Sequence, residues 1–362
     1  MGKTLKEAKW WELRTDGVIQ CELCPRHCVF KEEGDVGACG VRMRIGDKLV
    51  SLIYGKTSGW AVDPIEKKPL FHFYPGSAAF SIGTVGCNFF CLHCQNWFIS
   101  QARFKKGNTT PPIPLDELPP KRAVELAKTY NCTSIAYTYN EPLIFAEYVY
   151  DTAKLAEKEG IKNVLVTNGY VEEEPLRDLM KVIDAANVDL KGDERFYREV
   201  CGVRDGFEVV KRTIKTMKEN GIHVEVTCLI IPGYNDKDEF FESVAKWIYD
   251  EFGPDAVPLH FTAFYPNYRM TNVPPTPASA LLRARKIAMK RVGLHYVYTG
   301  NILHTEGETT FCPSCERPVI RRRGFSIVEY KLDENNRCKY CGTRINIVGK
   351  YKPESSWLFF YL

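Results

Sequence analysis

The sequence lacks any long apolar segment. Its longest apolar runs, such as residues 357–362, fall far short of the roughly 20 residues that cross a bilayer. The chain begins with a charged stretch, residues 1–7, and has no apolar core of a secretion signal there. Strong charge is also missing, because 49 basic against 45 acidic residues leave a formal net charge of only +4. These absences predict a cytoplasmic protein without a membrane partner, and the mild charge neither indicates nor excludes a nucleic acid.

Cysteine, by contrast, is abundant. The chain has 14 cysteines, a high count for a compartment that keeps thiols reduced, where clustered cysteines usually bind metal. Three groups stand out in the sequence: Cys21, Cys24, Cys28 and Cys39; Cys87, Cys91 and Cys94; and Cys312, Cys315, Cys338 and Cys341. The isolated Cys132, Cys201 and Cys228 are predicted to be packing residues.

The middle of the chain alternates strand-like and helix-like patterns. The predicted strands cover residues 79–84, 134–139, 163–169, 186–191, 223–233, 259–266 and 296–300. The predicted helices cover residues 141–160, 207–221, 237–253 and 275–293, and each range ends on glycine. Strands joined by helices require a parallel sheet, so residues 76–304 are predicted to form an α/β domain, a partial or full (β/α) barrel.

The regions on either side of this domain differ from it in composition. Residues 1–75 are rich in cysteine, glycine and charge, and are predicted to be a small N-terminal module. Residues 305–362 contain two Cys-x-x-Cys pairs and are predicted to be a small C-terminal module. Residues 105–120 are polar and proline-rich, which favours a loop over the barrel mouth.

The strongest chemical signal is the C-x3-C-x2-C spacing of Cys87, Cys91 and Cys94. Three thiolates on one tight loop can hold three corners of an iron–sulfur cubane. No fourth cysteine is nearby, which leaves one iron open for a small molecule. The loop directly follows the first predicted barrel strand, so it lies at the mouth where barrel enzymes place their chemistry. A zinc knuckle or chance clustering is the weaker interpretation.

This motif and its position resemble the radical S-adenosylmethionine (SAM) superfamily. The resemblance implies that the amino and carboxylate groups of SAM chelate the open iron of a [4Fe–4S] cluster. One electron then cleaves a carbon–sulfur bond, which yields methionine and a 5′-deoxyadenosyl radical that abstracts hydrogen from a substrate. In such chemistry the cofactor performs the difficult step, and the protein binds, orients and shields it.

Polar residues at the ends of the next predicted strands extend the resemblance. Tyr139, Asn140 and Glu141 take the place of the superfamily's Gly-Gly-Glu segment, which binds the methionine amino group. Glu141 is interpreted equally well as an acid that stabilises a helix N-terminus. Thr167 and Asn168 could contact ribose or carboxylate, or could simply form a strand-to-helix turn.

Asp189 and Lys191 flank Leu190 at the end of the fourth predicted strand, so their side chains point to one face. Charges on a buried strand need partners. The segment resembles the Asp-Leu-Lys of glycyl-radical enzyme activating enzymes, such as the one for pyruvate formate-lyase, which favours cofactor binding over a structural ion pair. Residues 231–236 resemble a loop near the adenine in that group. His260 would fit near the ribose, although a lone histidine is more often a core residue.

The chain as a whole resembles the radical SAM enzymes of the AmmeMemoRadiSam system, relatives of these activating enzymes. Besides the cysteine groups and the Tyr-Asn-Glu-Pro segment, the likeness rests on Pro25, Arg26, Gly34, Gly37 and the run Asp63-Pro64-Ile65-Glu66-Lys67-Lys68-Pro69-Leu70. The resemblance implies no particular substrate.

The two outer cysteine groups each supply four ligands, which closes the coordination of a metal. For the N-terminal group the alternatives are a second iron–sulfur cluster or a zinc ion, in a structural or electron-relay role. Many activating enzymes carry extra cluster cysteines after the main motif, whereas here they precede it, which weakens transfer of an activating-enzyme substrate. The C-terminal group predicts a zinc ribbon. The arginine run at residues 321–323 is interpreted as a solvated face rather than a contact for RNA or an acidic partner.

The leading hypothesis is therefore a radical SAM enzyme supplied by an electron donor such as ferredoxin or flavodoxin. Its substrate would be a protein, as in glycyl-radical enzyme activation, or alternatively an RNA or a small metabolite. A non-catalytic iron–sulfur or zinc scaffold is the competing class of function. The three-ligand group argues against that class, because a scaffold has no need of a vacant iron.

Overall fold

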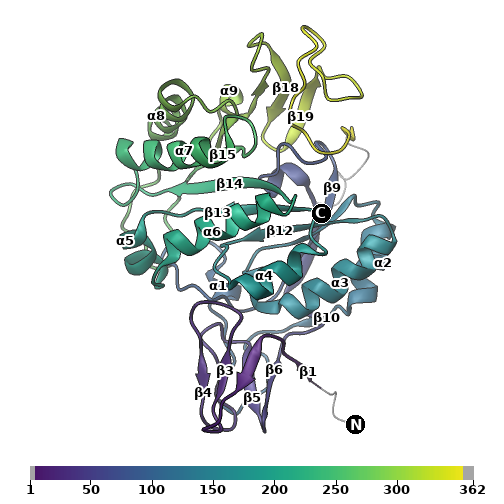
Figure 1. Cartoon of the computed structure of the whole chain (residues 1–362), viewed down its shortest axis with the longest axis vertical. Helices are drawn as coiled ribbons and strands as arrows, with labels where there is room; N and C mark the ends of the chain where they lie inside the picture. The colour runs from purple at the N-terminus through teal and green to yellow at the C-terminus, as the bar shows by residue number, and fades with distance from the viewer. Residues whose placement is uncertain (1–4, 354–362) are drawn as a thin grey trace.

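The computed structural model shows one large sheet with helices packed against it and a smaller, strand-rich part at either end (Figure 1). The structure describes residues 5–353, so the first four residues and the apolar run 357–362 lie outside the described residues. Within residues 5–353, no helix is both long and apolar enough to span a bilayer.

The large sheet has eight strands in the order β16-β15-β14-β13-β12-β11-β9-β8. They are β8 (Gly59–Pro64), β9 (Ala78–Gly83), β11 (Ser134–Tyr137), β12 (Lys162–Thr167), β13 (Ala185–Asp189), β14 (His223–Ile230), β15 (Leu259–Ala263) and β16 (Val297–Gly300). All neighbours from β9 to β16 are parallel, and β8 runs antiparallel to β9. Because β8 and β16 form opposite edges of the sheet, the architecture is a partial (β/α) barrel, one of the two predicted forms.

The predicted strands all form, and several end earlier than their patterns suggest. β11 ends at Tyr137 and β14 at Ile230, so the polar residues that follow leave the sheet. β9 is buried along its whole length, as expected for a central strand covered on both faces. β8 lies inside the cysteine-rich N-terminal region yet pairs with β9 throughout, and the module boundary near residue 75 stays a prediction.

Crossover helices join the parallel strands. They are α2 (Pro120–Thr129), α3 (Ala146–Lys158), α4 (Glu173–Met180), α6 (Gly206–Glu219), α7 (Asp238–Phe252) and α8 (Ala278–Lys286). α6 and α7 closely match predicted helices, whereas the short α2 and α4 were not predicted. α3 follows a 3-10 turn, η2 (Pro142–Phe145), and α8 continues into a π-helix, η4 (Ile287–Val292). Short helical segments complete the barrel region and its C-terminal edge: α1 (Trp97–Ser100), α5 (Glu194–Phe196), η3 (Tyr197–Cys201) and α9 (Thr305–Glu308).

The N-terminal part, purple in Figure 1, consists of short antiparallel strands. They are β1 (Lys6–Glu7), β2 (Trp11–Leu13), β3 (Ile19–Cys21), β4 (Val29–Phe30), β5 (Arg42–Ile45), β6 (Lys48–Ser51) and β7 (Lys56–Thr57). The stretch 105–120 does not cover the mouth as predicted. It lies along the N-terminal part instead, because β10 (Asp116–Glu117) pairs with β7 and Gly107 N–H donates to the Gly34 carbonyl at 3.0 Å.

The C-terminal part, yellow in Figure 1, is a three-stranded antiparallel sheet of β17 (Thr310–Phe311), β18 (Pro318–Arg323) and β19 (Ser326–Tyr330). The prediction of a fully solvated arginine run is wrong for Arg322, which is completely buried. Its guanidinium lies over the Phe71 ring, 4.2 Å from the centroid, and donates to Thr310 Oγ1 at 2.9 Å. The alternating burial of a sheet strand therefore places this arginine in the contact with the barrel.

The segment after β8 contacts the starts of β14 and β15. It starts with the 3-10 turn η1 (Ile65–Lys67), and His72 N–H then donates to Glu225 Oε1 at 2.7 Å. Glu225 Oε2 lies 2.7 Å from His260 Nε2, and both side chains are buried. His260 sits at the start of β15, and its Glu225 partner makes it a buried, hydrogen-bonded core residue.

Candidate active site and metal centres

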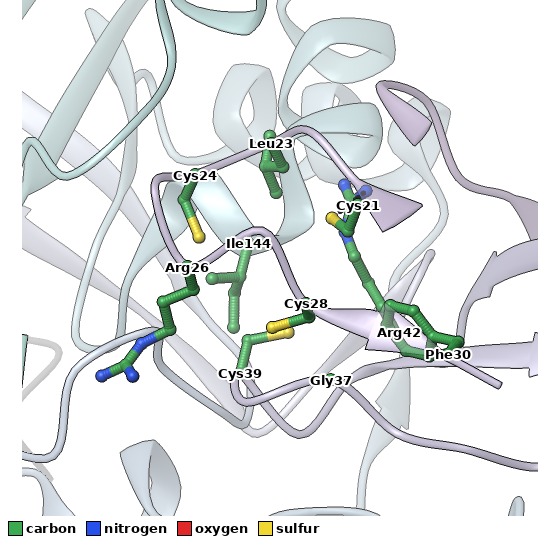
Figure 2. A pocket seen from close by; sticks show the side chains of 10 residues that line it. All are labelled: Cys21, Leu23, Cys24, Arg26, Cys28, Phe30, Gly37, Cys39, Arg42 and Ile144. Atoms are coloured by element: carbon green, nitrogen blue, oxygen red, sulfur yellow. Dashed lines mark hydrogen bonds between the residues drawn. The ribbon is translucent and has the colours of Figure 1, made fainter. Parts of the chain in front are cut away.

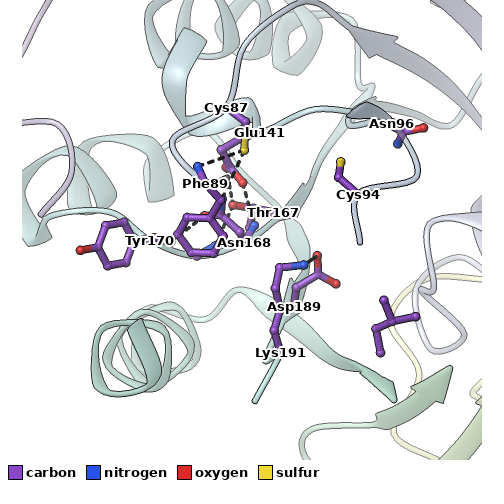
Figure 3. Close-up of polar contacts among 12 residues, drawn as sticks. Cys87, Phe89, Cys94, Asn96, Glu141, Thr167, Asn168, Tyr170, Asp189 and Lys191 are labelled. Atoms are coloured by element: carbon purple, nitrogen blue, oxygen red, sulfur yellow. Dashed lines mark hydrogen bonds and ion pairs between the residues drawn. The ribbon is translucent and has the colours of Figure 1, made fainter. Parts of the chain in front are cut away.

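A pocket of about 620 Å³ opens where the parallel strands end. Its lining comes from the loop after β9 and from the ends of β11, β12, β13, β14 and β15. Cys87, Cys91 and Cys94 line it together with every predicted cofactor residue: Tyr139, Asn140, Glu141, Thr167, Asn168, Asp189 and Lys191. Most of these side chains are drawn in Figure 3, facing the space between the strand ends. Parallel strands bring their carboxyl ends to one edge, so residues far apart in the sequence meet here.

The cluster loop, residues 84–96, is held from both sides. Cys87 N–H donates to the Cys39 carbonyl at 3.3 Å, and Phe90 N–H donates to the Cys201 carbonyl at 2.9 Å. Gly86 has a φ of 86°, and a Cβ atom there would lie only 2.5 Å from the Cys39 oxygen. Glycine is therefore required at this position by both backbone conformation and close approach.

The three thiols of this loop are less tightly grouped than the four C-terminal thiols. Four thiolates around zinc lie about 3.8 Å from one another, because each Zn–S bond is about 2.3 Å in a tetrahedron. Thiolates on a cubane spread more widely, since each binds a different iron. Over residues 5–353, three or more such ligand atoms lie within 4.8 Å of one another in the C-terminal cysteine group alone. Cys87, Cys91 and Cys94 therefore fit a cubane better than a single zinc ion.

Protonation of these thiols follows from their environment. Burial raises the pKa of Cys87 well above its ordinary value, and the nearby Glu141 carboxyl adds to this shift. A hydrogen bond with Cys201, together with burial, raises the pKa of Cys91. Both groups are neutral thiols near pH 7 until a metal displaces their protons.

Glu141 accepts hydrogen bonds from three directions. Its Oε1 accepts from Leu143 N–H at 3.0 Å. Oε1 also accepts from Thr167 Oγ1 at 2.6 Å, and Oε2 accepts from Asn168 N–H at 2.7 Å (Figure 3). The first bond caps η2, so the helix-terminus role suggested by the sequence is present. A carboxylate has about four acceptor positions, so one remains for a donor in the pocket. Burial raises the pKa of Glu141 to about 7.

Asn140 and Tyr139 position the cluster loop. Asn140 Oδ1 accepts from Thr84 N–H at 3.0 Å, and its Nδ2 donates to the Gly86 carbonyl at 3.0 Å. Tyr139 has a φ of 70°, a left-handed conformation that glycine would favour. Its hydroxyl donates to Asp63 at 2.5 Å, which stabilises this conformation from the side chain.

Asp189 and Lys191 form an ion pair of 2.7 Å across the pocket from Glu141 (Figure 3). The side chains are 33% and 13% exposed, so this is a partly buried pair that a ligand can reach. The Lys191 carbonyl accepts from Asn235 Nδ2 at 2.7 Å. Residues 231–236 thus hold the backbone of Lys191 in place. Among the described residues that line the pocket, none belongs to this loop.

Sequence reasoning missed several residues of this site. His93 Nδ1 and Thr227 Oγ1 are buried, line the pocket and have no hydrogen-bond partner among residues 5–353. Orphaned polar atoms of this kind are expected where a polar ligand binds. Cys201, predicted to be a packing residue, accepts a hydrogen bond from Phe90 N–H of the cluster loop, and its thiol raises the pKa of Cys91. His93 could have been suspected from its place inside the cysteine motif, whereas Thr227 and Cys201 carry no local signal.

The C-terminal cysteines form a compact group. Cys312 and Cys341 have sulfurs 3.5 Å apart, those of Cys315 and Cys338 are 3.8 Å apart, and all four lie within 4.8 Å of one another. Hydrogen bonds with Thr343 lower the pKa of Cys341 to about 6, which favours a thiolate ligand. These spacings match a tetrahedral zinc site.

The N-terminal cysteines also come together. Cys21, Cys24, Cys28 and Cys39 line one cavity beneath Leu23 and beside Ile144 (Figure 2). The structure thus brings together each of the three cysteine groups found in the sequence.

The chain is similar to several known proteins. The profile of the radical SAM superfamily matches residues 81–244. An uncharacterized protein of Methanocaldococcus jannaschii is 46% identical over 347 residues, which cover 95% of this chain and 100% of that protein. The pyruvate formate-lyase 1-activating enzyme of Escherichia coli K12 is 24% identical over 219 residues, or 56% of this chain and 85% of the enzyme. Among solved structures, Streptococcus suis SuiB bound to S-adenosylmethionine aligns with a TM-score of 0.46 and 15% identity, over 63% of this chain and 49% of that one.

Proposed function

The chain belongs to the radical SAM superfamily, and from that premise we propose that Cys87, Cys91 and Cys94 hold the [4Fe–4S] cluster of a SAM-cleaving enzyme. Such a cluster, once bound and reduced, supplies one electron that splits SAM into methionine and a 5′-deoxyadenosyl radical. The observation that carries the proposal is the meeting of a three-thiol loop with the Glu141 network in one pocket.

The chain's own residues would bind the amino acid end of SAM. Glu141 has one acceptor position left over and faces the pocket, where it can accept a hydrogen bond from the SAM ammonium group. Lys191 can pair with the SAM carboxylate, because Asp189 is its one ion-pair partner among residues 5–353. Thr167 and Asn168 orient Glu141, and Asn140 orients the cluster loop, so these three act as positioning residues.

Two buried polar atoms without a hydrogen-bond partner are available to the nucleoside part of SAM. Thr227 Oγ1 comes from β14 and His93 Nδ1 from the cluster loop, and both line the pocket without a partner in the described structure. Burial lowers the pKa of His93 to about 3, so its ring is neutral and can donate or accept one hydrogen bond. A polar sugar or purine edge would satisfy both atoms.

For the substrate, exposed aromatic side chains near the pocket favour a protein over RNA or a small metabolite. Phe325 lines the pocket and is 48% exposed, and Tyr265, also 48% exposed, bonds to the carbonyl of the lining residue Asn301. Trp97 and Phe98 follow the cluster loop and are 45% and 58% exposed. Exposed aromatic patches of this kind are typical of protein contacts. The burial of Arg322 removes part of the basic run that would have supported RNA binding.

The first test measures SAM cleavage. The anaerobically purified protein is reconstituted with iron and sulfide, reduced with dithionite and supplied with SAM, and 5′-deoxyadenosine is quantified. Cys91→Ala should lose the product, whereas Cys132→Ala, which removes a buried cysteine outside the pocket, should retain it. A fully loaded cluster that forms no 5′-deoxyadenosine, even with cell extract added, would favour the scaffold interpretation.

A second test addresses the substrate class. Cell extract is divided into a protease-treated, an RNase-treated and a small-molecule fraction, and each is added to the SAM cleavage assay. Stimulation that protease treatment abolishes and RNase treatment spares supports a protein substrate. Stimulation by the small-molecule fraction, or its loss after RNase treatment, would replace the protein by a metabolite or an RNA.

For the C-terminal group we propose a structural zinc ion. Support comes from the compact sulfur spacing and from the location of Cys312 and Cys338 in the apolar contact between β16 and the C-terminal sheet. A closed four-thiolate site of this kind stabilises a fold and leaves no position for a reacting ligand.

A further inference from the structure

We propose that Cys21, Cys24, Cys28 and Cys39 hold a second [4Fe–4S] cluster, which passes electrons to the cluster loop through the contact between Cys39 and Cys87. The relay part of this proposal rests on the proposed function of the pocket. The identity of the metal does not, because it concerns the N-terminal site alone.

The cavity between the four cysteines fits a cubane better than zinc. All four side chains line it, and in Figure 2 they surround one space bordered by Ile144. In the described chain their sulfurs, like those of the cluster loop, form no group of three within 4.8 Å, whereas the C-terminal sulfurs do. A zinc ion needs sulfurs about 3.8 Å apart, and a cubane spreads its four thiolates over four irons.

Groups around the cavity suit the negative charge of a thiolate-bound cluster. Ala38 N–H donates to Cys28 Sγ at 3.3 Å, and the fully buried Arg42 places Nη1 3.9 Å from Cys21 Sγ. Arg42 is itself fixed by Glu147 at 2.5 Å. Hydrogen bonds and nearby charge of this kind set the reduction potential of iron–sulfur clusters.

The two cluster sites are in direct contact. Cys87 N–H donates to the Cys39 carbonyl at 3.3 Å, so covalent bonds and a single hydrogen bond connect a ligand of one site to a ligand of the other. Arg103 bridges the same wall, since its Nη2 donates to the Cys87 carbonyl at 3.2 Å and its charge acts on both Cys39 and Cys87. Gly86 permits this approach, because a Cβ atom there would collide with the Cys39 oxygen.

The outer side of the N-terminal site opens on a basic surface pocket. This pocket of about 450 Å³ is lined by Cys28 and Ala38 together with three arginines, Arg26, Arg198 and Arg204. Positive charge beside a cluster ligand suits an acidic one-electron donor protein of the ferredoxin or flavodoxin class. The donor would lose one electron there, the N-terminal cluster would gain it and pass it on, and one SAM would be cleaved per electron delivered.

The metal is tested by analysis of iron, sulfide and zinc in four proteins. Wild type should contain about eight irons and eight sulfides per chain, and the triple variant C87A/C91A/C94A should keep about four of each. Cys24→Ala with Cys28→Ala should also keep about four, while Cys132→Ala keeps all. The reduced triple variant should show a cluster EPR signal that SAM does not alter. A triple variant without iron but with a second zinc would overturn the assignment, whatever the outcome for SAM cleavage.

The relay is tested by the ratio of the rate with flavodoxin to the rate with dithionite, because a general loss of active protein lowers both rates equally. Rates of 5′-deoxyadenosine formation are measured with reduced flavodoxin and with dithionite, a small reductant that needs no docking site. In the Cys24→Ala/Cys28→Ala variant the flavodoxin-to-dithionite ratio should fall by about tenfold or more, and Arg204→Glu should lower it by raising the KM for flavodoxin. An unchanged ratio in the cysteine variant would overturn the relay, and an unchanged KM in Arg204→Glu would overturn the docking side.

Discussion

Lys68→Met tests how the wall of the pocket is held in place. Lys68 Nζ lies 2.6 Å from Asp63 Oδ2, and the two side chains are only 2% and 1% exposed. The same Asp63 oxygen accepts the Tyr139 hydroxyl at 2.5 Å, and Lys67, 34% exposed, bonds the other oxygen at 2.8 Å. Removal of Lys68 therefore leaves the buried Asp63 carboxylate, which holds Tyr139, with less positive charge to balance it.

The expected loss of stability follows from this burial. Breaking a buried ion pair by removing one partner costs about 3–5 kcal/mol, and the remaining Lys67 and Tyr139 contacts place Lys68→Met near about 3 kcal/mol. In a chain of this length that corresponds to a fall in Tm of roughly 4 °C. The double variant with Asp63→Asn buries no unpaired charge, so it should lose less than the sum of the two single variants by about 1–3 kcal/mol.

The assay is thermal unfolding of the cluster-loaded protein under anaerobic conditions, followed by circular dichroism, with SAM affinity measured by calorimetry. Lys67→Met is the matched control and should lose less than about 1 kcal/mol, because its ion pair is partly exposed. Lys68→Met should also weaken SAM binding through Tyr139. A Tm unchanged within error, or a double variant as unstable as the sum of its parts, would refute the reasoning.

Three further predictions concern Cys341, Cys201 and His72. Cys341→Ser should lower zinc from about one to about zero per chain without changing iron, as measured by metal analysis; loss of iron together with zinc would contradict separate sites. Cys201→Ala should leave the iron content intact and make the midpoint potential of the cluster-loop centre more negative by roughly 20–60 mV, because the Cys201 thiol, a neighbour that can donate to the Cys91 sulfur once Cys91 binds iron, is lost. An EPR-monitored redox titration with no shift would exclude that role. Burial lowers the pKa of His72 to about 4, compared with about 6.5 in the unfolded chain. Between these two values only the unfolded chain binds this proton. The free energy of unfolding therefore falls by about 1.4 kcal/mol for each pH unit as the pH drops through this range. His72→Gln should remove this part of the slope in denaturant titrations at pH 6.5 and 5, and an identical slope in both proteins would show that His72 does not carry it.

Local patterns in the sequence were sufficient for much of the fold. Periodicity placed the parallel strands and most long helices, since alternation and helical spacing report which faces a segment buries. It missed β8, whose residues lie in a cysteine-rich stretch and pair antiparallel with β9. It also placed residues 105–120 over the mouth, because a polar, proline-rich stretch carries no information about which neighbour it will pack against.

What the sequence by itself determined was the chemistry of the ligands: three cysteine groups, and polar residues at successive strand ends that the parallel topology gathers into one pocket. Only the tertiary structure decided which groups touch. It placed Cys39 next to Cys87 and Cys201 next to Cys91. It also buried Arg322 between the C-terminal sheet and the barrel, while Arg321 and Arg323 stay exposed. The spacing of the cysteine ligands is a property of short stretches of the sequence. Contacts between distant segments depend on how sheets and loops pack, which no local sequence pattern determines.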